Sequence, residues 1–123
     1  MEDPRLLVTR VYSIGYKPGK GSVLQTEHFR RWLDGLADGP SQRRIAARII
    51  ALQAGHLGDW RSVNRDVSEL RLHFGPGYRV YFTRRRRSLF VLLAGGDKQS
   101  QRRDIEVARW LARNIDVRKD TDP

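Results

Sequence analysis

The sequence predicts an α+β fold in which a helical hairpin and a C-terminal helix pack on a small antiparallel sheet. Three observations predict it. Two adjacent segments, 27–37 and 41–55, carry apolar residues at helical spacing. Two strand-like segments flank a Gly-Pro-Gly turn at 75–77, and an apolar run at 89–94 precedes a last helical pattern. The expected order is therefore helix, helix, three antiparallel strands, helix.

The N-terminal region divides at a loop. Residues 5–13 are rich in Leu, Val, Thr and Tyr and are compatible with a strand. Proline and glycines then interrupt the chain at 16–22, and residues 23–25 resemble a second short strand. We predict an extension at 1–22, which either joins the sheet or forms an appendage, and a domain at 23–115.

The first predicted helix begins after a capping residue. Thr26 is a good N-cap, and Glu27 follows in the first turn, where the helix dipole favours an acid. The apolar side chains that continue the helix to residue 37 are Phe29, Trp32, Leu33 and Leu36. The sequence Asp38-Gly39-Pro40 ends this helix and starts the next one.

The second predicted helix ends at Gly55. Its apolar stripe consists of Ile45, Ile49 and Leu52. Three basic residues lie largely outside this stripe: Arg43, Arg44 and Arg48. We interpret them as a solvated helix face rather than as a binding surface. The following polar segment, 56–67, is expected to be irregular.

A predicted β-hairpin at 69–82 places its side chains alternately on two faces. If its apolar residues face the core, four other side chains gather on the opposite face: Arg71, His73, Arg79 and Tyr81. This face would combine two permanent cations with an imidazole and a phenol on a rigid ladder. Such a face suits an anionic ligand that has a proton to move.

The arginines around His73 should favour its neutral imidazole, which is the form that a general base requires. The alternative is an exposed strand histidine without a chemical role. Arg71 and Arg79 could likewise pair with Glu69 and nearby aspartates. The excess of cations nevertheless predicts that some arginines stay unpaired and available for phosphate.

The C-terminal part of the domain begins with a basic turn, expected at 83–88. Residues 89–94 are apolar on both faces and are typical of a buried central strand. The Gly-Gly-Asp-Lys loop at 95–98 lacks the spacing of a nucleotide-triphosphate loop. The last helix carries Ile105, Ala108, Leu111, Ala112 and Ile115 on one side. The charged tail, 116–123, is expected to fray.

The charge composition indicates an acidic partner. Lys and Arg total 24 against 14 acidic residues, for a formal net charge of +10, and most of the excess is arginine, which suits bidentate phosphate contacts. Nucleic acid is therefore the leading partner class, although an acidic protein fits the charge equally well. The sequence has no cysteine and no metal-ligand spacing, so we expect no metal or cofactor. No apolar run is long enough to span a bilayer, so we expect a cytoplasmic protein without a membrane partner.

Several blocks together resemble one family. They are Phe29-x-x-Trp32-Leu33-x-x-Leu36, Arg48-Ile49, Gly58-Asp59, Glu69-Leu70-Arg71, the GPGYRVYF block from Gly75 to Phe82, the LLAGGDKQSQ block from Leu92 to Gln101, and Asp104-Ile105. Over about 23–115 the chain resembles the RelE/ParE toxin superfamily. The closer resemblance is to its addiction-module killer-protein branch, which is related to the HigB-type toxins.

The resemblance implies the toxin of a type II toxin–antitoxin system. Most such toxins inhibit translation by cleaving mRNA on the ribosome, through attack of a ribose 2′-OH on the adjacent phosphate. The implied partners are the ribosome, mRNA and a cognate antitoxin that is acidic or binds DNA. The alternative is a toxin that poisons DNA gyrase without nuclease activity, and a third hypothesis is a degenerate toxin that only binds its antitoxin.

The family's site residues carry over position by position. Arg79 matches the arginine of the Tyr-Arg pair, which is usually a phosphate ligand in the cleaving toxins. Arg71 and His73 match basic residues of the preceding strand, and Lys98 matches the basic residue after the Gly-Gly turn. We assign charge stabilisation to Arg71 and Arg79, phosphate positioning to Lys98, and proton transfer to His73.

Further candidates complete the predicted site. Those for RNA or phosphate binding are Arg61, Tyr81, Arg84 and Arg85. Those for an additional role are Asp97, Gln101 and Asp104. The chain departs from the branch pattern with Arg61 in place of lysine, Ser62 in place of proline, Asn64 in place of glycine and Ala94 in place of cysteine. Arg61 keeps the charge for phosphate binding but not the proton transfer that a lysine could perform.

Overall fold

The α+β architecture is confirmed by the computed structural model, which describes residues 11–13, 22–86 and 89–115. Its elements are β1 (Val11–Ser13), β2 (Ser22–Thr26), α2 (Glu27–Asp34), α3 (Gly39–Gln53), β3 (Trp60–Ser62), β4 (Ser68–Arg71), β5 (Arg79–Arg86), β6 (Leu89–Gly96) and α4 (Gln101–Asn114). The predicted strand at 5–10, the loop at 16–21 and the tail at 116–123 lie outside the described residues.

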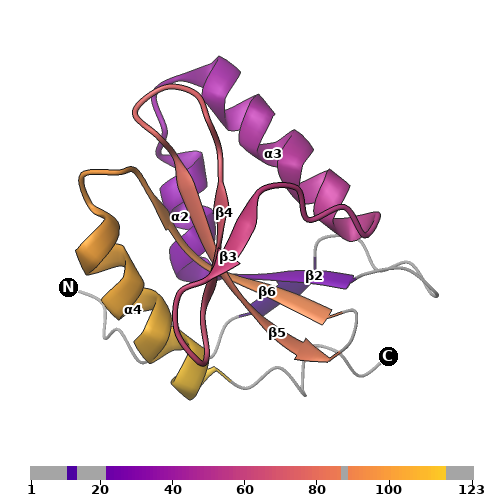
Figure 1. The fold of residues 1–123 in the computed structure, drawn as a ribbon. Coiled ribbons are helices and arrows are strands. Elements are labelled where there is room, and N and C mark those ends of the chain that lie inside the picture. The colour runs from indigo at the N-terminus through magenta and orange to yellow at the C-terminus, as the bar shows by residue number, and fades with distance from the viewer. Residues whose placement is uncertain (1–10, 14–21, 87–88, 116–123) are drawn as a thin grey trace.

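The sheet has six strands in the order β1-β2-β6-β5-β4-β3 (Figure 1). Neighbouring strands run antiparallel except β2 and β6, which are parallel. The predicted core of three antiparallel strands is therefore only part of a sheet of six. β1 pairs with β2, so residues 11–13 of the predicted extension belong to the sheet. β3 lies in the segment expected to be irregular, because three exposed residues give no alternating pattern.

Both helices of the predicted hairpin begin at side-chain caps. The Thr26 hydroxyl accepts a hydrogen bond from the Phe29 N–H at 3.0 Å, and the Asp38 carboxylate accepts one from the Ser41 N–H at 3.3 Å. The first helix ends at Asp34 rather than at 37, because glycine at position 35 disfavours its continuation. The second ends at Gln53, and Gly55 follows with a φ of 92°.

The helices form two layers around the sheet (Figure 1). α2 and α3 pack on one face, where their side chains join Leu70, Val80 and Leu92 in a buried cluster. α4 packs on the other face, over Tyr81, Val91 and Leu93. β6 is buried along its whole length, which confirms the predicted central strand. No helix among the described residues has the length and apolar character needed to cross a membrane.

The Gly-Pro-Gly turn between β4 and β5 is also confirmed. Gly75 and Gly77 have φ values of 57° and 79°, which residues with a Cβ rarely adopt. β5 then continues through Arg86. Arg84 and Arg85 therefore lie on a strand, and the prediction of a basic turn from residue 83 was wrong for them. The antiparallel ladder with β6 supplies the hydrogen bonds that extend this strand.

Candidate nucleic-acid interface

Arg71 and Arg79 lie opposite each other at one end of the sheet, as partners in the β4–β5 register. The Arg71 Nε–H donates to the Glu69 carboxylate at 3.2 Å. The Arg79 Nε is buried and has no hydrogen-bond partner among the described residues. Arg71 is therefore held by an acid, whereas the Nε–H of Arg79 remains unsatisfied by the described part of the protein.

Glu69 is the acid that organises this end of the sheet. Its side chain is fully buried, and its carboxylate accepts hydrogen bonds from Arg61 at 2.6 Å, Arg71 at 3.2 Å and Gln101 at 3.2 Å. These three contacts compensate a charge that would otherwise be costly to bury. Arg61 and Gln101, both predicted site residues, thus contribute to the packing between β3, β4 and α4.

Tyr81 does not share an open face with the arginines, and this part of the prediction was wrong. Its side chain is 0% exposed, and its hydroxyl has no hydrogen-bond partner among the described residues. Burial raises the pKa of the Tyr81 phenol above its ordinary value, and the nearby Glu69 and Asp104 carboxylates raise it further. The alternation of side chains along the strand predicted that this face of the sheet is open, but α4 covers it. The Tyr81 side chain therefore lies out of reach of an RNA ligand.

The remaining acidic candidates shape the start of α4. The Asp97 carboxylate accepts from the backbone N–H groups of Gln99 at 2.9 Å and Ser100 at 3.0 Å. Asp104 is buried and accepts from the Ser100 hydroxyl. A Cβ on Gly96 would overlap the Asp104 carboxylate, so α4 can approach β6 only because residue 96 is glycine.

Lys98 lies in the loop between β6 and α4. Its side chain is exposed, and its backbone N–H contacts the Pro76 carbonyl at 3.4 Å. The loop after the Gly-Gly turn therefore lies against the turn of the β4–β5 hairpin. This contact brings Lys98 to the same end of the sheet as Arg71 and Arg79.

Arg84 and Arg85 lie toward the opposite end of β5. Arg85 lies six positions beyond Arg79 along the strand, a rise of roughly 20 Å. The Arg84 guanidinium lies over the Phe90 ring at 4.9 Å from its centroid, and Arg85 donates to the Ala112 carbonyl near the C-terminal end of α4. The structure therefore does not bring these two arginines together with the predicted catalytic residues.

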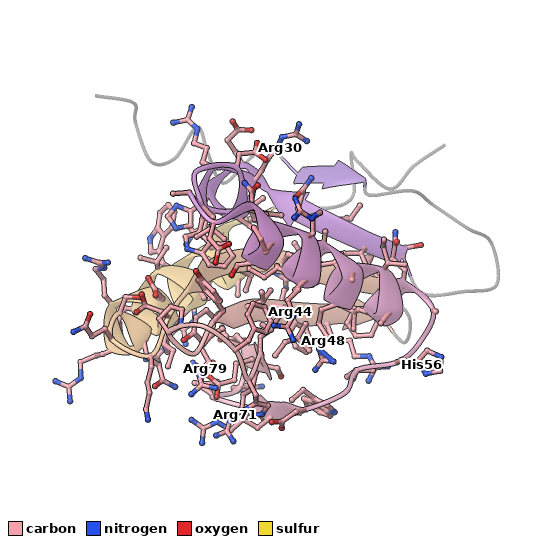
Figure 2. The ribbon with its side chains drawn as sticks, turned by 90° about the horizontal axis from the view of Figure 1, so that it is seen from above. Arg30, Arg44, Arg48, His56, Arg71 and Arg79 are labelled. Atoms are coloured by element: carbon pink, nitrogen blue, oxygen red, sulfur yellow. The ribbon has the colours of Figure 1, made fainter. Side chains whose placement is uncertain are left out.

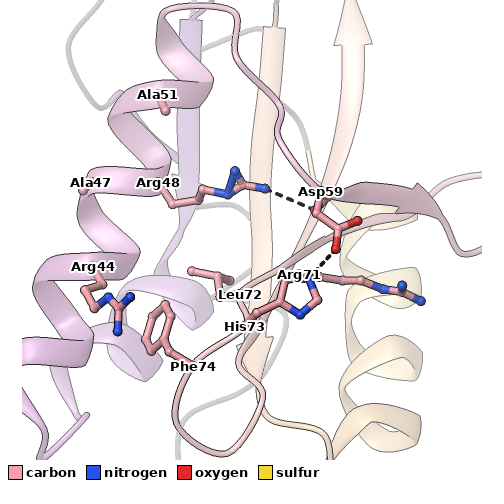
Figure 3. Close-up of a pocket in the computed structure, with 9 residues that line it drawn as sticks. All are labelled: Arg44, Ala47, Arg48, Ala51, Asp59, Arg71, Leu72, His73 and Phe74. Carbon is pink, nitrogen blue, oxygen red and sulfur yellow. Dashed lines mark hydrogen bonds and ion pairs between the residues drawn. The ribbon is translucent and has the colours of Figure 1, made fainter.

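His73 follows β4 and faces a groove between this segment and α3 (Figure 3). The polar and aromatic lining of this α3 groove is Arg44, Arg48, Asp59, Arg71, His73 and Phe74. β4 ends at Arg71, so the strict alternation that placed His73 beside Arg71 does not continue to residue 73. Figure 3 shows the Arg71 side chain pointing away from α3, while His73 turns toward Asp59.

The His73–Asp59 pair is exposed to solvent. The His73 Nε2 contacts the Asp59 carboxylate, and the two side chains are 70% and 46% exposed. The hydrogen bond from His73 lowers the pKa of Asp59, and the positive charges of Arg71 and Arg48 lower it further. The ionised carboxylate accepts the Nε2–H, which leaves Nδ1 of a neutral imidazole as a proton acceptor.

α3 contributes two arginines that sequence reasoning interpreted as a solvated face. Arg48 donates to the Asp59 backbone carbonyl at 3.1 Å, and the Arg44 guanidinium lies 4.2 Å from the centroid of the Phe74 ring. The available signal was the spacing of Arg44, Ala47, Arg48 and Ala51, because positions i, i+3, i+4 and i+7 share one helix face. Asp59 was also missed, since only the fold brings it to His73.

Four of these cations lie on the same side of the molecule: Arg44, Arg48, Arg71 and Arg79 (Figure 2). We call these four residues the cationic strip. Arg30 on α2 lies apart from them, and His56 lies beyond the C-terminal end of α3 (Figure 2). Among the described residues, no group of three or more His, Asp or Glu side chains is placed to hold a metal ion. The strip instead offers hydrogen-bond donors to phosphate groups.

The fold and the strip together define a small α+β protein with a partly exposed cationic surface. The chain belongs to the same family as a protein of Haemophilus influenzae (strain ATCC 51907 / DSM 11121 / KW20 / Rd) that carries the description "Uncharacterized protein". The two are 44% identical over 93 residues, which cover 76% of this chain and 94% of that protein. No family model matches the chain, and no solved structure matches it.

Proposed function

We propose that this protein is a toxin of a type II toxin–antitoxin system that cleaves mRNA on the translating ribosome. The observation that carries the proposal is the exposed His73–Asp59 pair beside the cationic strip (Figure 3). The resemblance to the RelE/ParE superfamily, given by the blocks around Arg79 and Lys98, supports the same activity. The net charge of +10 is in keeping with a polyanionic substrate.

The chemistry requires a base, a set of cations and an acid. In the proposed reaction, His73 Nδ1 removes the proton from a ribose 2′-OH while Asp59 holds the imidazole through Nε2. The 2′-oxygen attacks the adjacent phosphorus, and the bond to the 5′-oxygen breaks. The products are a 2′,3′-cyclic phosphate and a 5′-hydroxyl end, and the leaving oxygen takes its proton from an acid or from water.

Arg71 and Arg79 would stabilise the charge that develops on the phosphate in the transition state. The two lie on adjacent strands in register, which limits the reorganisation that binding requires. The terminal N–H groups of Arg79, which is half-buried, are donors that phosphate oxygens can accept. Lys98, on the loop that contacts Pro76, would position a neighbouring phosphate.

A cognate antitoxin is the second proposed partner. An acidic segment that covers the cationic strip would satisfy its arginines and block access of RNA. Association steered by a charge of +10 should be fast and should slow as the ionic strength rises.

The test is to express the protein without an antitoxin and to map the 5′ ends of cellular RNA. The wild type should arrest growth and create new 5′ ends within translated messages. His73→Ala should lower cleavage by about 100-fold or more, the usual contribution of a positioned general base. His56→Ala is the matched control, because His56 is exposed and lies away from the groove.

Two outcomes would contradict the proposal. Equal cleavage by His73→Ala and by the wild type would remove His73 from the mechanism. Growth arrest with a DNA-damage response and without new mRNA ends would favour the alternative, in which the protein poisons DNA gyrase.

A further inference from the structure

The α3 groove contains a feature that phosphate binding and proton transfer do not use. Its cavity volume is about 430 Å³, within the range of roughly 300–1,000 Å³ that is typical of small-ligand sites. Ala47 and Ala51 line the helix side between and beyond the two arginines, and these small side chains leave the groove open (Figure 3). Arg44 and Arg48 thus line a groove that a small ligand can enter.

Arg44 and Phe74 form a stacked pair in this groove. The Arg44 guanidinium lies over the Phe74 ring, 4.2 Å from its centroid, an arrangement stabilised by the attraction between a cation and the ring face. The Phe74 ring is itself fixed against Tyr78, with 5.6 Å between the ring centroids. The guanidinium carbon is therefore held over the face of a ring that packs against the core cluster.

The second face of the Arg44 guanidinium is available to a ligand. The residue is exposed, and no ion pair joins Arg44 to a carboxylate among the described residues. Because one face of the planar group lies on Phe74, the opposite face points away from the ring. A flat, delocalised and poorly hydrated cation of this kind stacks well on other planar groups.

Arg48 is fixed next to this pair, one helical turn further along α3. Its terminal nitrogen donates to the Asp59 carbonyl at 3.1 Å. A Cβ on residue 58 would overlap the Arg48 guanidinium, so the glycine there makes room for this reach. The remaining N–H groups of Arg48 are donors within the groove. The groove therefore combines a stacking surface with charged donors on the same helix.

We propose that the Arg44–Phe74 pair is a stacking subsite for an unpaired nucleobase of single-stranded RNA, with the neighbouring phosphate at Arg48. The proposal rests on the proposed function, since it adds a base subsite beside His73. A stacking platform requires an unpaired base, because the bases of a duplex are stacked on each other. The subsite accounts for an arginine held over an aromatic ring, which phosphate binding alone does not require.

The experiment compares two short oligonucleotides of equal charge. One is a 2′-O-methyl RNA trinucleotide with adenine bases, and the other is its abasic analogue with the same sugar–phosphate chain. The 2′-O-methyl groups prevent cleavage, so binding is measured alone. The wild type should bind the base-containing probe roughly tenfold more tightly, as one stacked base provides.

Arg44→Lys keeps the positive charge but removes the planar group. This variant should lose most of the preference for bases, measured as the ratio of its affinities for the two probes. Phe74→Leu should also lose the preference, because it removes the ring over which the guanidinium lies. The matched control is Arg30→Lys, since Arg30 is exposed on α2 and lies apart from the groove.

An unchanged preference in Arg44→Lys would overturn the proposal. A wild type that binds both probes equally would also overturn it, and would favour an acidic protein segment as the occupant of the groove. These outcomes are distinguishable from a failure of the proposed function. The cleavage assay with His73→Ala tests the proposed function whether or not the protein prefers the base-containing probe. The binding assay with the two probes tests the stacking subsite whether or not the protein cleaves mRNA.

Discussion

The two faces of the β4–β5 hairpin carry similar ionic groups in different surroundings. On the α4 face, the Glu69 carboxylate is 0% exposed and holds Arg61, Arg71 and Gln101. On the α3 side, the Asp59 carboxylate is 46% exposed and holds His73. A pair of an acidic and a basic side chain therefore stabilises the fold where a helix covers it, and stays accessible to a ligand where a groove remains.

The largest expected effect comes from the buried acid. Glu69→Ala should lower the free energy of unfolding by about 3 kcal/mol, because its partners lose the charge that compensates them. The value lies at the low end for buried pairs because Arg61 and Arg71 can regain water, being 51% and 31% exposed. Urea unfolding measures it, with Glu69→Gln as an intermediate control. A loss below about 1 kcal/mol would show that this acid does not hold the face together.

A second substitution tests how closely α4 lies on the sheet. Gly96→Ala would place a Cβ against the Asp104 carboxylate and 2.6 Å from the Ser100 hydroxyl. The required shift of α4 should cost about 2 kcal/mol. Gly39→Ala is the matched change on the α3 side, where the nearest atom belongs to the flexible Arg43 side chain. Thermal unfolding should show a clear decrease only for Gly96→Ala, and equal decreases would contradict the comparison.

Tyr81 provides a change of the opposite sign. Its buried hydroxyl has no partner among the described residues, and an unsatisfied buried hydroxyl is destabilising. Tyr81→Phe should therefore raise the free energy of unfolding by up to about 1 kcal/mol. If the variant instead unfolds more easily by about this amount, the hydroxyl makes a hydrogen bond to a bound water.

The exposed pair should show the smallest effect on stability and a distinct dependence on pH. Because the pKa of Asp59 is lowered, its stabilising contact is present above the ordinary value of about 3.9 and is lost as the pH falls through the lowered value. Between pH 5 and 7 the carboxylate should stay ionised. NMR titration of the Asp59 carboxyl carbon measures this, and a midpoint at or above the ordinary value would show that His73 does not hold it.

Asp59→Asn separates the two faces most directly. The substitution should leave the urea midpoint nearly unchanged but should slow the proposed RNA cleavage by about tenfold or more, because the imidazole loses the group that orients it. Growth arrest and 5′-end mapping measure the second effect. Full cleavage by Asp59→Asn would mean that His73 does not depend on this contact.

The sequence predicted the helices, the central strand and the Gly-Pro-Gly turn, because caps, periodicity and glycine chemistry are local signals. It did not predict the position of α4 over Tyr81 or the parallel pairing of β2 with β6. Alternation assigns residues to two faces of a strand but does not state which face a distant helix covers. For the same reason the site was found in part: Arg71 and Arg79 share one end of the sheet, whereas His73 joins Asp59 and the arginines of α3.

The parallel pairing of β2 with β6 has a consequence for the order in which the chain can fold. The Thr26 hydroxyl donates to the Leu93 carbonyl, across 67 residues of chain. As synthesis proceeds from the N-terminus, α2 and α3 are complete well before the strands that cover their apolar sides. The β4–β5–β6 meander needs only local contacts, while closing β2 onto β6 spans most of the domain. In refolding, we expect the amide hydrogens of β5 to gain protection before those of β2, which pulsed hydrogen exchange can measure. Until that late step, Val23 and Phe29 are exposed surfaces to which a chaperone or a second nascent chain can bind.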